Sequence, residues 1–89
     1  MRFQARVPEV VRDYFSSVGL DTEETYATHP IIVETYRPGA GWKRYPIRKR
    51  ISRTWAIRHL RPEGVTRVAL TVPGTNRVAD FAIEEVIRG

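Results

Sequence analysis

The first regular pattern of apolar residues lies near the start of the chain. The apolar positions that recur at helical spacing are Val10, Val11, Tyr14, Phe15 and Val18. Pro8 suits the first turn of a helix, and Gly19 is typical of the residue just beyond the end of one. The pattern therefore predicts an amphipathic helix over about 8–18.

Several later segments are rich in β-branched and aromatic residues, which is typical of strands. The predicted strands are residues 2–7, 31–36, 42–47 and 65–72. The sequence RPGAG at 37–41 indicates a turn, so 31–36 and 42–47 should form a hairpin. The polar segment 21–29 is interpreted as either a helical turn capped by Asp21 or Thr22 or a surface loop.

Residues 46–60 fit two templates. Read as a strand that begins at residue 45, one face carries Tyr45, Ile47, Ile51, Trp55 and Ile57. Read as a helix, Ile47, Ile51 and Trp55 align, but Ile57 and Leu60 fall on the opposite side. Period two accounts for more of the residues, so a strand is predicted here, with a break near Ser52.

The C-terminal segment 77–88 is also ambiguous between a strand and a short helix. A strand pairing with 65–72 and finishing in a helical turn is favoured, because Ala79, Phe81 and Ile83 alternate. The predicted fold class is α+β, with an antiparallel sheet of four or five strands packed against the N-terminal helix. The 89 residues contain no repeats or linkers, so 1–89 is expected to be a single domain. One helix covers one face of the sheet, and the other face should stay open.

Charge is distributed unevenly along this pattern. The formal net charge is +5, yet residues 35–62 contain nine Lys or Arg and no acid, which leaves the flanks at −4. Such a basic stretch favours a polyanionic partner, either the phosphate backbone of a nucleic acid or an acidic protein surface. Arginine predominates within it, and its planar fork suits bidentate contacts to phosphate or carboxylate groups.

The candidate binding residues are the cations and exposed aromatics of this stretch. They are Arg37, Trp42, Lys43, Arg44, Tyr45, Arg48, Lys49, Arg50, Arg53, Arg58 and Arg61. In the strand interpretation the even positions form an Arg row on the open face, with neighbours about 7 Å apart, close to the phosphate spacing of a nucleic acid. Trp42 is the candidate for stacking on a base, whereas Trp55 is expected in the core. The acidic flanks could instead fold against the row and neutralise it.

Other chemistry has little support in the sequence. The absence of cysteine excludes disulfides and thiolate metal sites and is compatible with a cytoplasmic location. His29 and His59 lie thirty residues apart without clustered carboxylates, so no metal and no cofactor are expected. The apolar runs are too short for a membrane span.

Three functions follow from these residues. The preferred one is a non-catalytic module that binds nucleic acid through the Arg/Lys-rich strand. The alternative is a protein-interaction module, such as an inhibitor or assembly subunit, that docks the same strand on an acidic protein surface. A small ribonuclease using His59 is the third. An open sheet edge would also permit a homo-oligomer.

Overall fold

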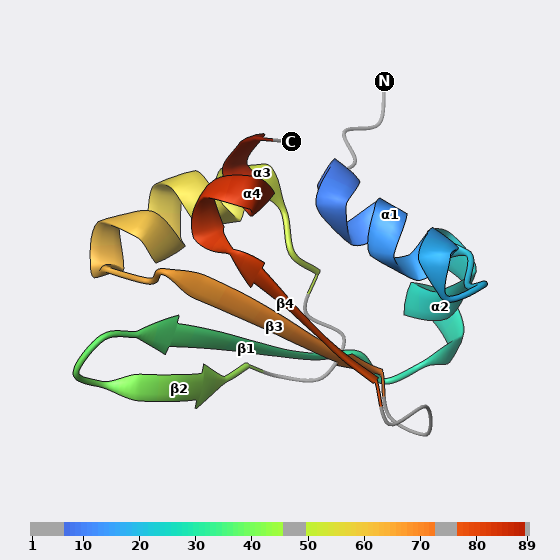
Figure 1. Cartoon of the computed structure of the whole chain (residues 1–89), viewed down its shortest axis with the longest axis horizontal. Coiled ribbons are helices and arrows are strands. Elements are labelled where there is room, and N and C mark those ends of the chain that lie inside the picture. The colour runs from blue at the N-terminus through green and yellow to red at the C-terminus, as the bar shows by residue number, and fades with distance from the viewer. Residues whose placement is uncertain (1–6, 46–49, 73–76, 89) are drawn as a thin grey trace.

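The structure, a computed structural model, describes residues 7–45, 50–72 and 77–88 of the chain, and of Arg77 the backbone alone (Figure 1). It shows an α+β fold. The helices are α1 (Glu9–Ser17), α2 (Thr22–Thr28), α3 (Arg53–Trp55) and α4 (Ile83–Arg88). The helix α3 continues without a break into a π-helical turn, η1 (Ala56–Leu60), and a 3-10 turn, η2 (Arg61–Glu63). The strands are β1 (Ile32–Arg37), β2 (Gly41–Arg44), β3 (Arg67–Val72) and β4 (Arg77–Ala82).

The four strands form one antiparallel sheet in the order β2-β1-β3-β4. Alternate residues along each strand face opposite sides of the sheet. Val33, Leu70 and Ala79 lie opposite one another on neighbouring strands, and all three are buried. This core face meets the helices, which lie on one side of the sheet in Figure 1. Within the described part of the chain, no helix or strand covers the other face of the sheet, which we call the open face.

Helix α1 confirms the predicted amphipathic helix. Val11 and Phe15 are fully buried, while Val10 and Tyr14 pack against the core from its margin. At the C-terminal end, Leu20 donates its backbone N–H to the Phe15 carbonyl at 2.8 Å, and Gly19 donates to Ser16 at 3.0 Å. These two bonds form a Schellman motif. The motif requires a positive φ at its C′ residue, and Gly19 adopts a φ of 78° without steric cost because it has no Cβ.

The strand predicted over residues 46–60 is wrong for its second half, because residues 53–63 are helical. The Ser52 side chain accepts a hydrogen bond from the Trp55 N–H at 3.0 Å and caps the helix. Ala56 and Leu60, four positions apart, are then fully buried. A period of two gives no weight to Ala56, although that residue lies on the helical face that enters the core. Residues 46–49 lie outside the described ranges.

The turn η1 is widened for a reason that the sequence contains. The Arg61 N–H bonds to the Ala56 carbonyl, five residues back instead of four. Pro62 follows directly, and a proline ring clashes with the carbonyl four positions before it. A wider turn relieves that clash. The helical run then ends at Gly64, whose φ is 88° and whose N–H bonds to the Arg61 carbonyl.

The remaining predictions of local structure are mostly confirmed. Residues 22–28 form the helical alternative, and the Asp21 side chain caps it by accepting from the Glu24 N–H at 2.9 Å. The hairpin β1–β2 is present, and β3 is the predicted strand. The C-terminal segment is a strand and then a helix, as favoured. The opening strand at 2–7 falls almost wholly outside the described residues; Val7 is buried but not in a strand.

Candidate nucleic-acid interface

The basic stretch is divided among three different environments in the fold. One part lies on the open face of the sheet, a second part is engaged by acids or backbone of other elements, and a third part lies beside the β2 edge. Arg48 and Lys49 lie outside the described residues. The prediction of a continuous Arg row on one strand face is therefore wrong for the described arginines. Arg58 is on a helix, and Arg50 precedes one.

On the open face, Trp42 and Arg44 project from β2. The Trp42 side chain is 48% exposed and its ring lies against Tyr36 of β1, with ring centroids 5.3 Å apart. The Arg44 guanidinium lies 4.0 Å from the Glu34 carboxylate, also on β1. The open face therefore offers an aromatic pair, while this arginine is partly compensated by its neighbour.

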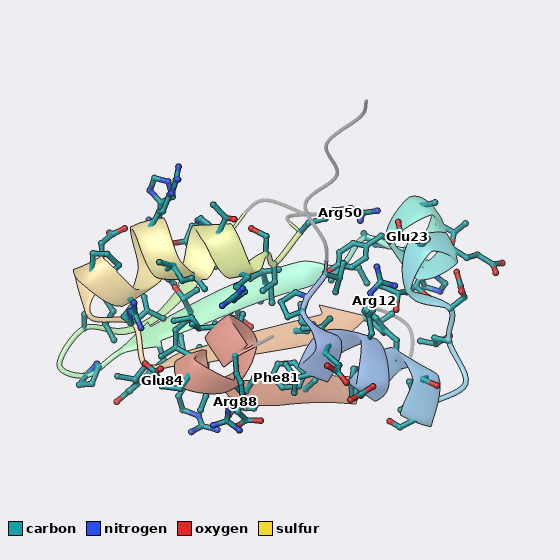
Figure 2. The ribbon with its side chains drawn as sticks, turned by 90° about the horizontal axis from the view of Figure 1, so that it is seen from above. Arg12, Glu23, Arg50, Phe81, Glu84 and Arg88 are labelled. Carbon is teal, nitrogen blue, oxygen red and sulfur yellow. The ribbon has the colours of Figure 1, made fainter. Side chains whose placement is uncertain are left out.

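The second part of the stretch is held by distant segments. The Arg50 guanidinium donates to the Glu23 carboxylate at 2.8 Å and lies over the Tyr26 ring, 4.7 Å from its centroid. Figure 2 shows Arg50 and Arg12 on either side of Glu23. The Arg53 guanidinium donates to the Ile87 carbonyl of α4. Arg61 lies 3.9 Å from Glu84. These three cations tie the stretch to α2 and α4.

The ion pair at Glu23 makes a small contribution to stability that depends on pH. Its hydrogen bond with Arg50 is the main cause that holds the pKa of Glu23 below the usual 4.5. A lowered carboxyl pKa adds stability above the unfolded value, and that stability is lost as the pH falls through the folded value. We expect Glu23→Gln to reduce the loss of melting temperature between pH 7 and pH 3. The contribution of this ion pair to the free energy of unfolding should be under about 1 kcal/mol, because the pair is exposed. An unchanged acid profile would contradict this.

The third part is a surface that we call the basic flank, defined by Arg37, Lys43, Tyr45, Trp55 and Arg58. Lys43 lies opposite the buried Thr35, so its side chain is on the helix side of the sheet. Its Nζ is 4.9 Å from the centroid of the Tyr45 ring. Tyr45 in turn meets Trp55 of α3 edge to face, with centroids 5.0 Å apart.

The basic flank combines cations with half-buried aromatic rings. Arg58 follows Trp55 by three positions, a spacing that makes side chains neighbours on a helix surface. Arg37 ends β1 beside the hairpin turn and is exposed, as is Arg58. In the described part of the chain, Arg37, Lys43 and Arg58 have no carboxylate within ion-pair distance. Three of the described cations without an ion pair thus belong to this surface, while Arg53 bonds to a backbone carbonyl and Arg88 lies by the groove between α1 and α4.

The aromatic residues of the basic flank differ from those that the sequence predicted for the binding surface. Trp42 is exposed but lies on the opposite side of β2 from Lys43, because adjacent strand residues alternate. Trp55, expected in the core, is half-buried: it packs against the core from its margin and also contacts Tyr45 of the basic flank. Trp55 and Arg58 become neighbours on one helical surface only because residues 53–63 are helical and not a strand.

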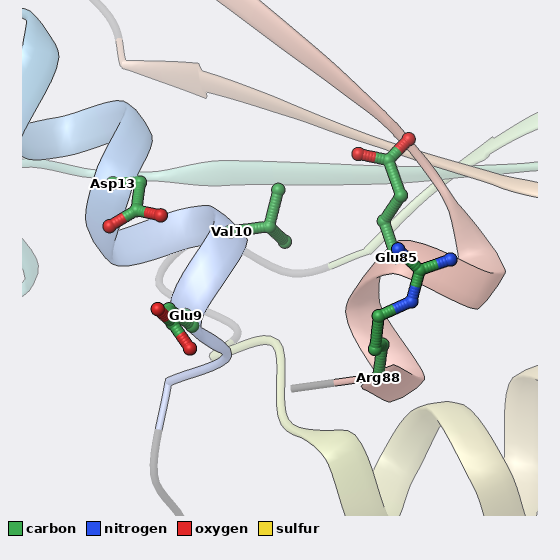
Figure 3. A pocket seen from close by; sticks show the side chains of 5 residues that line it. All are labelled: Glu9, Val10, Asp13, Glu85 and Arg88. Atoms are coloured by element: carbon green, nitrogen blue, oxygen red, sulfur yellow. The ribbon is translucent and has the colours of Figure 1, made fainter.

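The structure also forms a shallow acidic groove that the sequence analysis did not anticipate. It lies between α1 and α4, has a volume of about 220 Å³ and is lined by Glu9, Val10, Asp13, Glu85 and Arg88 (Figure 3). Within the described ranges, no three His, Asp or Glu side chains are grouped closely enough to hold a metal ion.

The histidines lie apart from one another. The His29 Nδ1 is 2.9 Å from the Thr28 hydroxyl, a contact between sequence neighbours. His59 is exposed on η1 beside Arg58. A ribonuclease needs an acid and a base at one site. Neither histidine has a second such group bonded to it among the described residues.

Comparisons with known proteins found no similarity: no protein-family model, no curated protein and no solved structure matches this chain. Among the helices that the structure describes, none has the length and apolar character needed to cross a lipid bilayer.

Proposed function

We propose that the chain is a non-catalytic module that binds single-stranded nucleic acid through the basic flank. The observation that carries the proposal is the series of contacts from Lys43 to Tyr45 and from Tyr45 to Trp55. Arg37, Lys43 and Arg58 are also exposed, and none of them is ion-paired within the described ranges. Cations that track a backbone and aromatic rings that stack on bases are the two components of single-strand binding sites.

The preference for single strands rests on the shape of the basic flank. It includes the end of β1, the edge strand β2 and the helical run that begins at α3, and the contact between Tyr45 and Trp55 joins the strand side to the helix side. Bases in a single strand can turn toward such rings, whereas bases in a duplex are stacked on one another. Each stacked base contributes about 1–3 kcal/mol, so single-stranded probes should bind more tightly than duplexes of the same length.

A salt titration tests the proposal directly. Fluorescence anisotropy with labelled single-stranded RNA and DNA and matched duplexes should show affinity that falls as salt rises. Three phosphate contacts on a single strand give a slope of about −2 in a plot of log affinity against log salt. Affinity that does not change with salt, or no binding at low salt, would reject a phosphate-binding role.

A second candidate function is docking on an acidic protein surface. The outer edge of β2, which pairs with no further strand among the described residues, favours it. Tyr45 donates its N–H to the Val33 carbonyl, so alternate residues of β2 bond to β1. The backbone groups of Trp42 and Arg44 therefore point away from the sheet, where an added strand could pair with them. A single stoichiometric partner that is retained after nuclease treatment would favour this candidate over the first.

A further inference from the structure

The open face of the sheet carries a pattern of charges that is complementary to itself. One row across the four strands reads Arg44, Glu34, Ala69 and Asp80. The next row reads Trp42, Tyr36, Arg67 and Ala82. The first row thus has a cation at the β2 end and an acid at the β4 end, with a carboxylate and a small residue between them.

The same face also exposes apolar surface. Trp42 is 48% and Val78 is 63% exposed, and these are the large hydrophobic side chains most accessible in the described part of the chain. They lie on β2 and β4, the two edges of the sheet. Ile32, Tyr36 and Ala82 are half-buried on the same face. Exposed apolar side chains thus occur on both edge strands and alternate with charged residues across the face, and an exposed apolar patch among polar residues is typical of a protein interface.

We propose that two copies of the chain pack face to face through these open sheet faces, related by a two-fold axis that runs along the strands between β1 and β3. This operation places β2 over β4 of the second copy and β1 over β3, while each row stays opposite the same row. Closed two-fold dimers are the commonest oligomers, and each residue pair then occurs twice.

Each row is complementary under this operation. Arg44 faces Asp80 of the second copy, and Glu34 faces the small side chain of Ala69. Within one chain Asp80 already accepts a hydrogen bond from Arg67 at 2.9 Å. Two charge networks result, each running from Arg67 and Asp80 of one copy to Arg44 and Glu34 of the other.

The second row places aromatic rings over small or cationic side chains. Trp42 faces Ala82 of the second copy, which leaves room for the indole. Tyr36 faces Arg67, whose guanidinium can lie on the ring. An alternative axis that runs across the strands through the first row would place Arg44 over Arg44 and Asp80 over Asp80. Like charges opposite one another oppose association, and an axis across the strands between the two rows would leave Arg44 facing Trp42 without its acidic partner, so the axis along the strands gives the better charge pairing.

The size of the face sets the expected strength. Four strands about 4.8 Å apart and about six residues long give a flat area of roughly 400 Å² per copy. Two copies therefore bury roughly 800 Å² in projection, and more when side-chain relief is included, which is near the lower limit for specific interfaces. We expect a dissociation constant in the micromolar range. The basic flanks stay outside this interface, so the dimer would present two of them.

Sedimentation velocity between roughly 5 μM and 500 μM, a range that brackets micromolar dissociation, tests the proposal. The wild-type chain should change from monomer to dimer over this range. Arg44→Asp and Asp80→Arg should each weaken the dimer at least about tenfold, because each places like charges opposite one another twice. Circular dichroism controls for folding. An exclusively monomeric wild-type chain, or a dimer unaffected by both substitutions, would overturn the proposal.

Mixing the two variants separates a loss of complementarity from a folding defect. In the mixed dimer, Asp at position 44 of one chain faces Arg at position 80 of the other, and the wild-type Asp80 faces the wild-type Arg44. Association should therefore be restored relative to either variant alone. The absence of this restoration, with both variants folded, would exclude the proposed pairing.

Discussion

Replacing Arg37, Lys43 and Arg58 together with alanine is expected to weaken binding of single-stranded RNA about 50-fold at about 0.15 M salt, because three phosphate contacts and the counterions they release are lost. The salt slope should become smaller in magnitude by about 2 for the same reason. Fluorescence anisotropy at several salt concentrations measures both quantities. These three residues are exposed or at the sheet edge, so circular dichroism should show an unchanged fold.

A variant with the same loss of charge is the matched control. Arg12→Ala, Arg61→Ala and Arg88→Ala also remove three cations, but Arg12 and Arg61 are paired with Glu23 and Glu84. Arg88 borders the acidic groove. This variant should lose less than about threefold in affinity, since only long-range attraction changes. Equal losses in the two variants would show that binding follows net charge, and the basic flank would then not be the binding surface.

Phe15→Ala is expected to destabilise the fold more than any of the surface substitutions described above. The Phe15 side chain is fully buried, and its ring meets Tyr26 edge to face with centroids 5.8 Å apart. Truncating a buried Phe costs about 3–5 kcal/mol, and a domain of this length has about 4–13 kcal/mol in total. The melting temperature should fall by about 15–30 °C. Urea unfolding followed by circular dichroism measures the free energy.

Two variants of the same helix control this measurement. Phe15→Leu keeps most of the buried volume and should lose only about 1–1.5 kcal/mol. Ser16→Ala changes an exposed neighbour and should lie within about 0.5 kcal/mol of the wild-type chain. A loss below about 1.5 kcal/mol for Phe15→Ala would contradict a central position of α1 in the core.

Local signals were sufficient for much of the fold. The helix at 9–17 could be predicted because its apolar stripe and its terminating glycine act within a few residues of each other. The hairpin followed from a Gly-rich turn between β-branched segments, and β3 from its alternation. The helix at 53–63 could not be predicted in the same way. Residues 53–63 form a helix and not a strand because a helix buries Ala56 and Leu60 in a core made by distant segments.

The amino-acid sequence by itself determined that the chain concentrates its positive charge in one acid-free stretch, since the order of charged residues is fixed by the sequence. Only the tertiary structure decided which of those charges remain available. Arg50 and Arg61 are compensated by Glu23 and Glu84, which lie more than twenty positions away along the chain. The alternation of β2 separates Lys43 from Trp42 onto opposite faces of the sheet. Coulombic compensation depends on distance in space, and that distance is set by packing and not by order in the sequence.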